Sequence, residues 1–137
     1  MAHGRSEILT AVRDHLRVTI SATGGNVFGV RGRSHKAPLP FLVVGADSET
    51  INRSTTQIIL SRSLLILIQV VASSEQERDD VALEVEGAME SIPGLAKGIL
   101  HITDDFGVRL ADGDQEHFIA ALRYRVIYKT DAAGLEP

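Results

Sequence analysis

The stretch from residue 57 to residue 71, QIILSRSLLILIQVV, constrains the fold of this chain more than any other feature. Successive side chains of an extended strand point to opposite faces of a sheet. Towards the end of this stretch both faces are apolar, with Ile66 and Ile68 on one face and Leu65 and Leu67 on the other. A strand of this kind has to be covered on both sides, either by layers of the same fold or by a second subunit.

A membrane-spanning helix does not explain this stretch. Such a helix needs about 20 consecutive apolar residues. Between Arg62 and Gln69 the uninterrupted apolar run has only five residues, Leu64 to Ile68. The N-terminal residues MAHGRSEILT contain no apolar signal core. We therefore expect a cytoplasmic chain without membrane association.

The composition limits the classes of protein to consider. A length of 137 residues suits one domain, and a hydrophobic fraction of 44% suffices for one core. Aromatic residues make up only 4%, so the core must be mainly aliphatic. The absence of cysteine excludes disulfides, thiolate metal sites and cysteine nucleophiles.

Charge is distributed unevenly along the chain. Residues 1–72 contain eight Lys/Arg and four Asp/Glu, a balance of +4, whereas residues 73–137 contain six and fourteen, a balance of −8. Two copies of such a chain can meet head to tail with complementary charge. The alternative explanation is one acidic, solvated helix face, and charge alone favours that alternative.

Residues 6–20 are predicted to form a helix. Apolar positions recur there at helical spacing, at Ile8, Val12 and Leu16 among others. The following Thr-Gly-Gly-Asn sequence at residues 23–26 is expected to end the helix.

Residues 74–92 are predicted to form a second helix. Ser74 and Glu77 match a capping box, in which Ser74 accepts from the Glu77 amide and Glu77 reaches back. One side of the helix is apolar, at Val81, Val85, Ala88, Met89 and Ile92. The other side carries seven acids against Arg78, namely Glu75, Glu77, Asp79, Asp80, Glu84, Glu86 and Glu90.

The remaining apolar segments are predicted to be strands. They cover residues 27–30, 41–45, 57–71, 99–103 and 118–130. Polar residues 46–56 are expected at the far end of a long hairpin, and residues 104–107 and 111–114 are expected to be turns.

These elements predict an α+β fold. The simplest solution is a single two-layer domain, with a mostly antiparallel sheet of four to five strands, a long β-hairpin and two helices packed on one face. The domain should cover residues 1–130, with residues 131–137 as a flexible tail. The other face of the sheet would be uncovered, and such a face requires a partner. The residues expected on it are Leu65, Leu67, Val71, Ile119 and Ile127.

No set of residues resembles an active site. The five histidines are scattered, and none is paired at the i, i+4 spacing of helical metal ligands. His101 precedes Asp104 and Asp105, but no serine lies in a nucleophile elbow. Neither a phosphate-binding loop nor a dinucleotide fingerprint is present. We expect no catalytic residue, no cofactor and no metal, and hence a binding or assembly role.

Basic residues cluster in the loop that precedes the second strand. Arg31, Arg33 and Lys36 lie there, and Arg53 and Arg62 lie on or near the hairpin. The loop is either simply solvated or a contact to a polyanion or to an acidic protein face.

The order and spacing of several segments resemble the tail terminator (minor tail protein U-like) family of long-tailed bacteriophages. The similarity covers about residues 6–130. The segments that carry it are the helix at 8–16, Gly25-Asn26-Val27-Phe28, Leu39-Pro40 leading into the strand 41–44, the helix with Asp79-Asp80, Val85 and Ala88, and the closing strand Tyr124-Arg125-Val126-Ile127-Tyr128-Lys129-Thr130. The basic loop at residues 31–36 matches no family role.

The resemblance implies a structural virion protein without enzymatic activity. Proteins of this family form hexameric rings that cap the tail tube, stop its polymerisation and present the surface that joins the head. The implied partners are further copies of the chain, the major tail tube protein and the head–tail connector protein, with DNA passing through the ring. The implied location is the head-proximal end of the virion tail, after assembly in the host cytoplasm.

The resemblance also suggests roles for particular residues. The uncovered apolar residues and the acidic Glu84 and Glu86 would meet a neighbouring subunit or the tube. The basic residues of the loop and the hairpin would face the channel or a partner. Two alternatives remain open: a head–tail connector or neck completion protein, and a ferredoxin-like ligand-binding regulatory domain.

Overall fold

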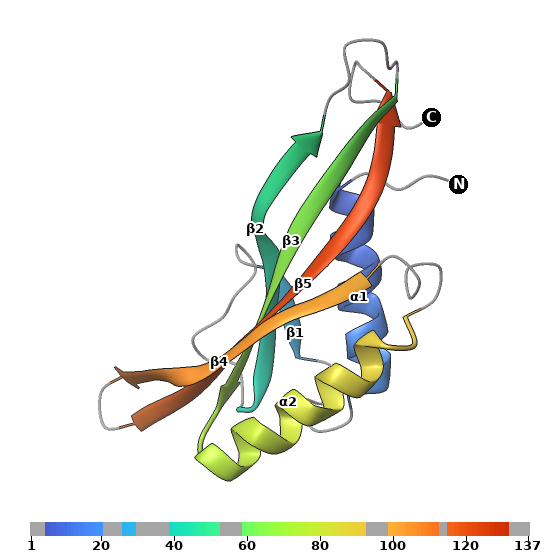
Figure 1. Cartoon of the computed structure of the whole chain (residues 1–137). Coiled ribbons are helices and arrows are strands. Elements are labelled where there is room, and N and C mark those ends of the chain that lie inside the picture. Colours follow the sequence, from blue (N-terminus) through green and yellow to red (C-terminus); the bar gives the residue numbers. More distant parts are fainter. Residues whose placement is uncertain are drawn as a thin grey trace.

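The computed structural model describes residues 5–20, 26–29, 39–52, 59–92, 99–112 and 115–131 (Figure 1). Two helices and five strands follow one another along the chain. They are α1 (Arg5–Thr19), β1 (Val27–Gly29), β2 (Phe41–Asn52), β3 (Ile59–Ala72), α2 (Glu75–Met89), β4 (Ile99–Asp112) and β5 (Gln115–Asp131).

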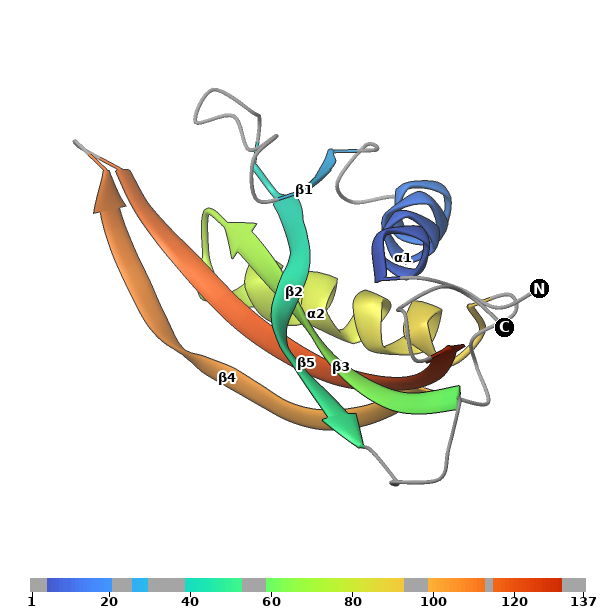
Figure 2. The ribbon, with the colours of Figure 1, turned by 90° about the horizontal axis from the view of Figure 1, so that it is seen from above.

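The five strands form one open sheet in the order β1-β2-β3-β5-β4. β1 pairs with β2 in parallel, and every other neighbouring pair is antiparallel. Both helices pack on the same side of this curved sheet (Figure 2). The predicted α+β fold, with a mostly antiparallel sheet, a long hairpin and two helices on one face, is confirmed.

The doubly apolar stretch forms β3, the central strand of the sheet. β3 pairs along most of its length with β2 on one side and with β5 on the other. Its helix-side residues Leu64, Ile66, Ile68 and Val70 are completely buried. Each side chain of this size contributes about 1.5–3 kcal/mol when it is fully buried. The main core therefore lies between the centre of the sheet and the helices.

Both helices cover this core with the apolar stripes that the sequence predicts. α1 contributes Ile8, Val12 and Leu16, all at 0% exposure. α2 contributes its complete predicted stripe, namely Val81, Val85, Ala88 and Met89, and Ile92 just after its end. None of the helices in the described part of the chain is long and apolar enough to cross a membrane.

α2 begins with a modified capping box. The Ser74 hydroxyl accepts from the Glu77 amide at 3.2 Å, as predicted. The Glu77 carboxylate, however, accepts from the amide and the hydroxyl of Ser73, at 2.9 and 3.0 Å. In the standard motif the Glu77 carboxylate would accept from the amide of the cap residue Ser74; here it accepts from the residue before it.

Three strands are longer than the sequence predicts. β2 continues beyond residue 45 to Asn52, β4 continues beyond residue 103 to Asp112, and β5 begins at Gln115. The polar residues of β2 and β4 remain paired with the neighbouring strands. The pairing is irregular there, with one register shift in β2, between Ala46 and Ser48, and two in β4. The predicted turn at residues 104–107 is therefore wrong, because this segment is an irregular part of β4.

The sheet face opposite the helices is partly covered by the chain itself. Val71 and Ile119 are only 2% and 4% exposed. They form a second small core with Phe41 and Val43, against which Phe28 packs. The Phe28 and Phe41 rings meet edge to face, with centroids 5.9 Å apart. The prediction that Val71 and Ile119 are uncovered is wrong, because the aromatic side chains of β1 and β2 shield this end of the face.

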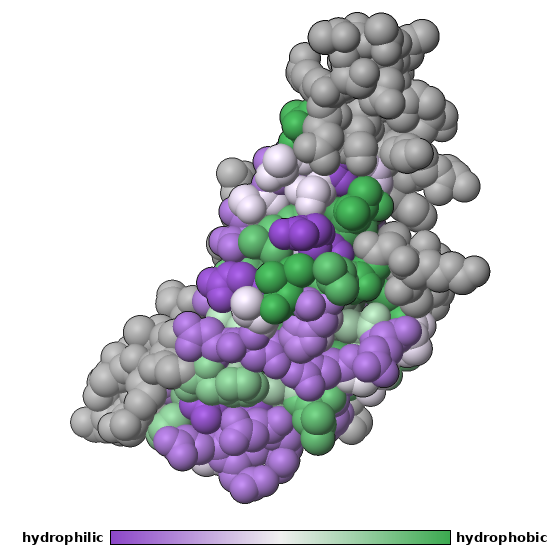
Figure 3. All heavy atoms as spheres, viewed as in Figure 1, coloured by the Kyte–Doolittle hydropathy of each residue, from purple (hydrophilic) through white to green (hydrophobic). Residues whose placement is uncertain are grey.

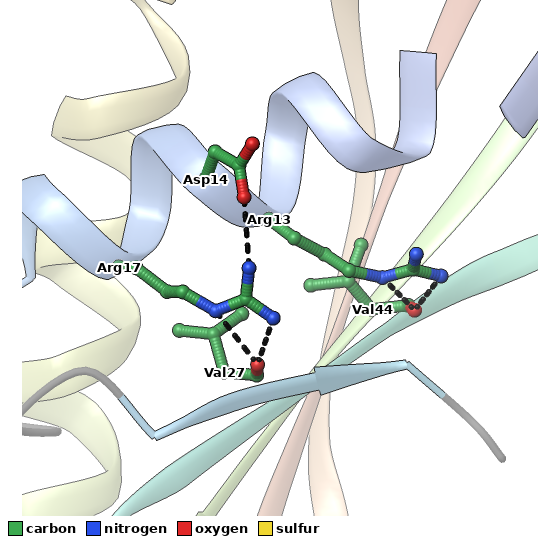
Figure 4. Close-up of polar contacts among 5 residues, drawn as sticks. All are labelled: Arg13, Asp14, Arg17, Val27 and Val44. Atoms are coloured by element: carbon green, nitrogen blue, oxygen red, sulfur yellow. Dashed lines mark hydrogen bonds and ion pairs between the residues drawn. The ribbon is translucent and has the colours of Figure 1, made fainter. Parts of the chain in front are cut away.

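Two arginines of α1 bind the helix to the edge of the sheet, Arg17 to β1 and Arg13 to β2 (Figure 4). Arg17 donates from Nε and Nη2 to the carbonyl oxygen of Val27, at 3.2 and 2.8 Å. Arg13, one helical turn earlier, donates in the same way to the Val44 carbonyl oxygen, at 3.3 and 3.1 Å. Gly29 leaves room for this contact, because a Cβ there would lie 3.1 Å from the Arg13 guanidinium.

Replacing both arginines by methionine (Arg13→Met/Arg17→Met) should lower the free energy of unfolding by about 2 kcal/mol, because two partly buried carbonyls lose charged donors. The matched double variant Arg123→Met/Arg125→Met, on the opposite face of the sheet, should change it by only about 0.5 kcal/mol. Urea denaturation measures both values. Equal losses in the two double variants would contradict a stabilising role of the α1 arginines.

Candidate functional site

The sheet face opposite the helices has an area of accessible apolar side chains. Leu65 and Leu67 are half-buried there, and Leu100 and Ile127 are each 58% exposed. In the register, Leu65 lies opposite Arg125, and Leu67 lies opposite Arg123. We call these six residues the outer face. Figure 3 shows an apolar area over the middle of the sheet, interrupted by strongly hydrophilic side chains.

The charges on the outer face are loosely held. Arg123 Nε lies 3.4 Å from Asp47 Oδ2, and about a third of each side chain is exposed. Arg125 is exposed. Exposed ion pairs of this kind contribute at most about 1 kcal/mol. Both guanidiniums are therefore available to acidic groups on a partner, beside apolar side chains that gain from burial.

The outward side of α2 has the opposite charge. Glu84 is exposed there, next to Leu83, which is 70% exposed. A hollow of about 370 Å³ adjoins this side, between α2 and β4. It is lined by Arg78, Asp79, Ala82, Leu83, Glu86 and Phe106. The outward side of α2 thus combines carboxylates with an accessible apolar side chain.

Arg78 fixes the position of β4 against α2. It is the one basic residue of α2, and it is only 8% exposed. Its Nη1 donates to the Phe106 carbonyl oxygen at 2.7 Å, and its guanidinium lies 5.4 Å from the centroid of the Phe106 ring. Its Nε also contacts Asp79 at 3.0 Å. The positive charge of Arg78 is therefore buried in the contact between α2 and β4.

Glu86, predicted as an interface residue, lies instead beside β4. It is half-buried, and its carboxyl group is hydrogen-bonded to that of Asp104. This hydrogen bond, followed by burial, raises the pKa of Glu86. His101 and Tyr124 adjoin the two carboxyls: the rings of His101 and Tyr124 stack with centroids 4.5 Å apart.

Arg62, predicted as a loop contact, lies within β3 and on the helix side of the sheet. Its Nη1 donates to Glu49 Oε1 at 2.8 Å, and the two side chains are only 17% and 13% exposed. The Tyr128 hydroxyl donates to the other carboxylate oxygen of Glu49 at 2.6 Å. The position of Arg62 within the predicted strand 57–71 is therefore confirmed, and its contact to a channel or partner stays a prediction.

Two opposing effects act on the pKa of Glu49. Burial raises it, but the hydrogen bond from Tyr128 and the one from Arg62 outweigh burial and hold it below its ordinary value. Burial and the bond to Glu49 raise the pKa of Tyr128 to about 12. Glu49 is therefore ionised and Tyr128 protonated at neutral pH, which stabilises the hairpin.

The other basic residues predicted to contact a partner, Arg31, Arg33, Lys36 and Arg53, lie outside the described residues, as do residues 132–137 of the predicted tail. Among the predicted interface residues, Leu65, Leu67 and Ile127 lie together on the outer face, whereas Val71 and Ile119 are buried and Glu84 and Glu86 lie on α2. Their interface role stays a prediction.

Sequence reasoning missed two parts of the site. Leu100 completes the outer face, and its alternation with Ile99 and His101 in the predicted strand 99–103 was an available signal. The contact of His101 and Asp104 with Glu86 depends on a register shift in β4, which no local pattern indicates.

Comparison with known proteins gives a shared fold. No protein-family model matches the chain, and neither does any curated protein sequence. A chain in the virion of a native gene transfer agent (GTA) particle has a TM-score of 0.58 and 15% sequence identity, over 89% of this chain and 94% of that chain. The gp17 protein of bacteriophage SPP1 has a TM-score of 0.42 and 16% identity, over 85% of this chain and 91% of that chain. The first comparison shows a common fold, and the score of the second is too low to support an argument.

Replacing Glu49 by glutamine should lower the free energy of unfolding by about 1–2 kcal/mol at neutral pH. A carboxyl whose folded pKa is depressed stabilises the fold above its unfolded pKa, and that contribution is lost as the pH falls through the folded pKa. The difference between wild type and variant should therefore shrink on acidification below the ordinary carboxyl range. Urea denaturation at several pH values measures it, with the exposed Glu84→Gln as control. A difference that is independent of pH would contradict this assignment.

Proposed function

We propose that this chain is a structural virion protein of a long-tailed bacteriophage or a related tail-like particle, and that it acts as a tail terminator. In this role several copies form a ring on the end of the tail tube, stop further polymerisation of the tube and provide the surface that joins the head. The activity is assembly, without catalysis.

The observation that carries the proposal is the outer face. Leu65, Leu67, Leu100 and Ile127 form an accessible apolar area on a sheet whose other side is already packed against helices. Accessible apolar residues gathered on one face of a small domain, with polar groups around them, are typical of a protein–protein interface. Arg123 and Arg125 add positive charge to the same area.

A complementary surface is present on the same chain. The outward side of α2 offers exposed carboxylates around Leu83. This side and the outer face are different surfaces of the molecule, so contact between them is heterologous. Heterologous contacts generate a ring when the rotation between subunits closes. Opposite charges at the two surfaces favour this orientation over contact between two identical faces.

The shared fold is consistent with this role. The chain has the architecture of a component of a GTA virion over nearly its full length. Fold alone does not determine function, so the likeness supports the proposal only together with the outer face. The resemblance in residue order to tail terminators supports a more specific position in the particle, namely the end of the tail tube.

The proposed partners follow from the ring. Copies of this chain, six in the related family, make the ring itself; the major tail tube protein binds one side and the head–tail connector protein the other. DNA would pass through the channel of this ring. Arg31, Arg33, Lys36 and Arg53 are the residues that we expect to face the channel or a partner.

Leu65→Glu tests the interface without removing the fold. A glutamate at this position lies opposite Arg125, and a cross-strand pair of opposite charge contributes about 0.2–1 kcal/mol. It would, however, repel the acidic side of α2 on a neighbouring copy. We expect a folded variant that forms no rings, measured by light scattering and by electron microscopy over a range of concentrations. Ile127→Glu should behave in the same way.

Val18→Glu is the matched control, because Val18 is 87% exposed on α1 and belongs to neither of the two surfaces. It should assemble like the wild type. Ring formation by Leu65→Glu and Ile127→Glu at wild-type concentrations would contradict the proposed interface.

Particles that lack the protein distinguish a tail terminator from a head–tail connector. Electron microscopy should show tail tubes longer than normal, because nothing stops polymerisation. Tubes of normal length without attached heads would instead identify a head–tail connector.

A further inference from the structure

A register shift in β4 brings two metal-ligating side chains to the same side of the sheet. His101 pairs with Tyr124, and Thr103 pairs with Arg123, which directly precedes Tyr124 in the antiparallel strand β5. Two steps along β4 thus match one step along β5, so Ile102 is an extra residue in β4. Without this bulge, His101 and Asp104 would point to opposite faces. With it, both point towards α2. Bulges are frequent beside functional sites, where they redirect a side chain.

α2 supplies a third ligating group at the same place. The ligand atoms of Glu86, His101 and Asp104 all lie within 4.8 Å of one another. His101 Nε2 lies 2.5 Å from Asp104 Oδ1, and Glu86 is hydrogen-bonded to Asp104. In a tetrahedral zinc site, ligand atoms about 2.0–2.2 Å from the metal are about 3.4 Å from each other. The present separations, from 2.5 Å to at most 4.8 Å, lie on both sides of this value.

A buried hydroxyl without a partner lies next to these three groups. Tyr124 is 3% exposed, and its hydroxyl has no hydrogen-bond partner among the residues that the structure describes. Burial, followed by the negative charges of Glu86, Asp104 and Glu90, raises the pKa of this hydroxyl. Buried hydroxyls normally have a partner, and an unsatisfied one indicates a missing group.

A cavity joins these groups. A space of about 230 Å³ is lined by Glu86, Met89, Glu90, Ile99, His101 and Tyr124. Tyr124 and two of the three ligating residues, Glu86 and His101, therefore line the same cavity. A space of this size holds a cation with one or two water molecules. A metal-bound water would give the Tyr124 hydroxyl the hydrogen-bond partner that it lacks.

We propose that Glu86, His101 and Asp104 bind one divalent transition-metal cation, Zn²⁺ in type, with the Tyr124 hydroxyl bonded to the metal or to its bound water. The imidazole nitrogen selects the metal class, because Mg²⁺ and Ca²⁺ prefer sites made of oxygen alone. Two carboxylates and one imidazole leave the fourth position open for water or Tyr124.

The site would have a mechanical consequence. Glu86 belongs to α2, and His101 and Asp104 belong to β4, which is the edge strand of the sheet. A cation that bridges them adds to the Arg78–Phe106 contact and fixes the edge strand to the helix layer. It also removes the repulsion between two adjacent carboxyls. Metal binding should therefore stabilise the fold, independently of whether the chain forms rings.

Titration of the metal-free, untagged full chain with ZnCl2 tests the proposal. Calorimetry should show one Zn²⁺ per chain with micromolar affinity or tighter, and Zn²⁺ should raise the melting temperature. MgCl2 and CaCl2 at the same concentrations should bind at least about 10-fold more weakly. Co²⁺ should give the visible absorption of a site with nitrogen and oxygen ligands.

Variants separate this site from the general acidity of α2. Glu86→Gln and His101→Asn should each weaken Zn²⁺ binding by more than about 100-fold, since loss of an outer-shell partner alone costs 10–100-fold. Glu84→Gln, which removes the same charge from the exposed side of the same helix, should bind like the wild type. Glu86→Gln removes a carboxyl–carboxyl contact, so the metal-free variant should unfold no earlier than the wild type.

The outcomes that overturn the proposal are equally specific. They are the absence of Zn²⁺ binding, equal binding by Glu86→Gln and Glu84→Gln, and equal affinity for Zn²⁺ and Mg²⁺. In each of these cases Glu86, His101 and Asp104 do not form a transition-metal site.

Discussion

The central strand β3 is the constraint on which the rest of the structure depends, because it is apolar on both of its faces. Its helix-side residues require α1 and α2, and they are completely buried by them. On its other face, Leu65 and Leu67 are only half-buried. One strand thus requires a two-layer fold and leaves apolar side chains whose exposure to water is unfavourable. We propose that assembly with other copies of the chain buries this surface.

Much of this organisation could be predicted from the sequence, and the reasons are local. The apolar stripes of α1 and α2 follow the helical period, and alternation in β5 correctly separates Leu122 and Tyr124 from Arg123 and Arg125. The failures concern residues whose environment depends on distant parts of the chain. Val71 is covered by a cluster that includes Phe28, more than forty residues away, and no local pattern shows that contact.

The ends of the strands show a second kind of limit. Asp104, Asp105 and Gly107 have the composition of a turn, yet they lie within β4 because β5 continues beside them. A register shift accommodates them at the cost of regular pairing. A second register shift in β4, between His101 and Thr103, brings His101 and Asp104 to the same side of the sheet, next to Glu86. A departure from local propensity and a candidate ligand site therefore coincide, which is where sequence rules are expected to fail.

Electron cryomicroscopy of the intact particle measures the central claim most directly, because it shows what lies against the outer face. The account predicts that Leu65, Leu67 and Ile127 are buried against α2 of a neighbouring copy, with carboxylates of that helix beside Arg123 and Arg125. An outer face that is open to solvent in the particle would contradict it.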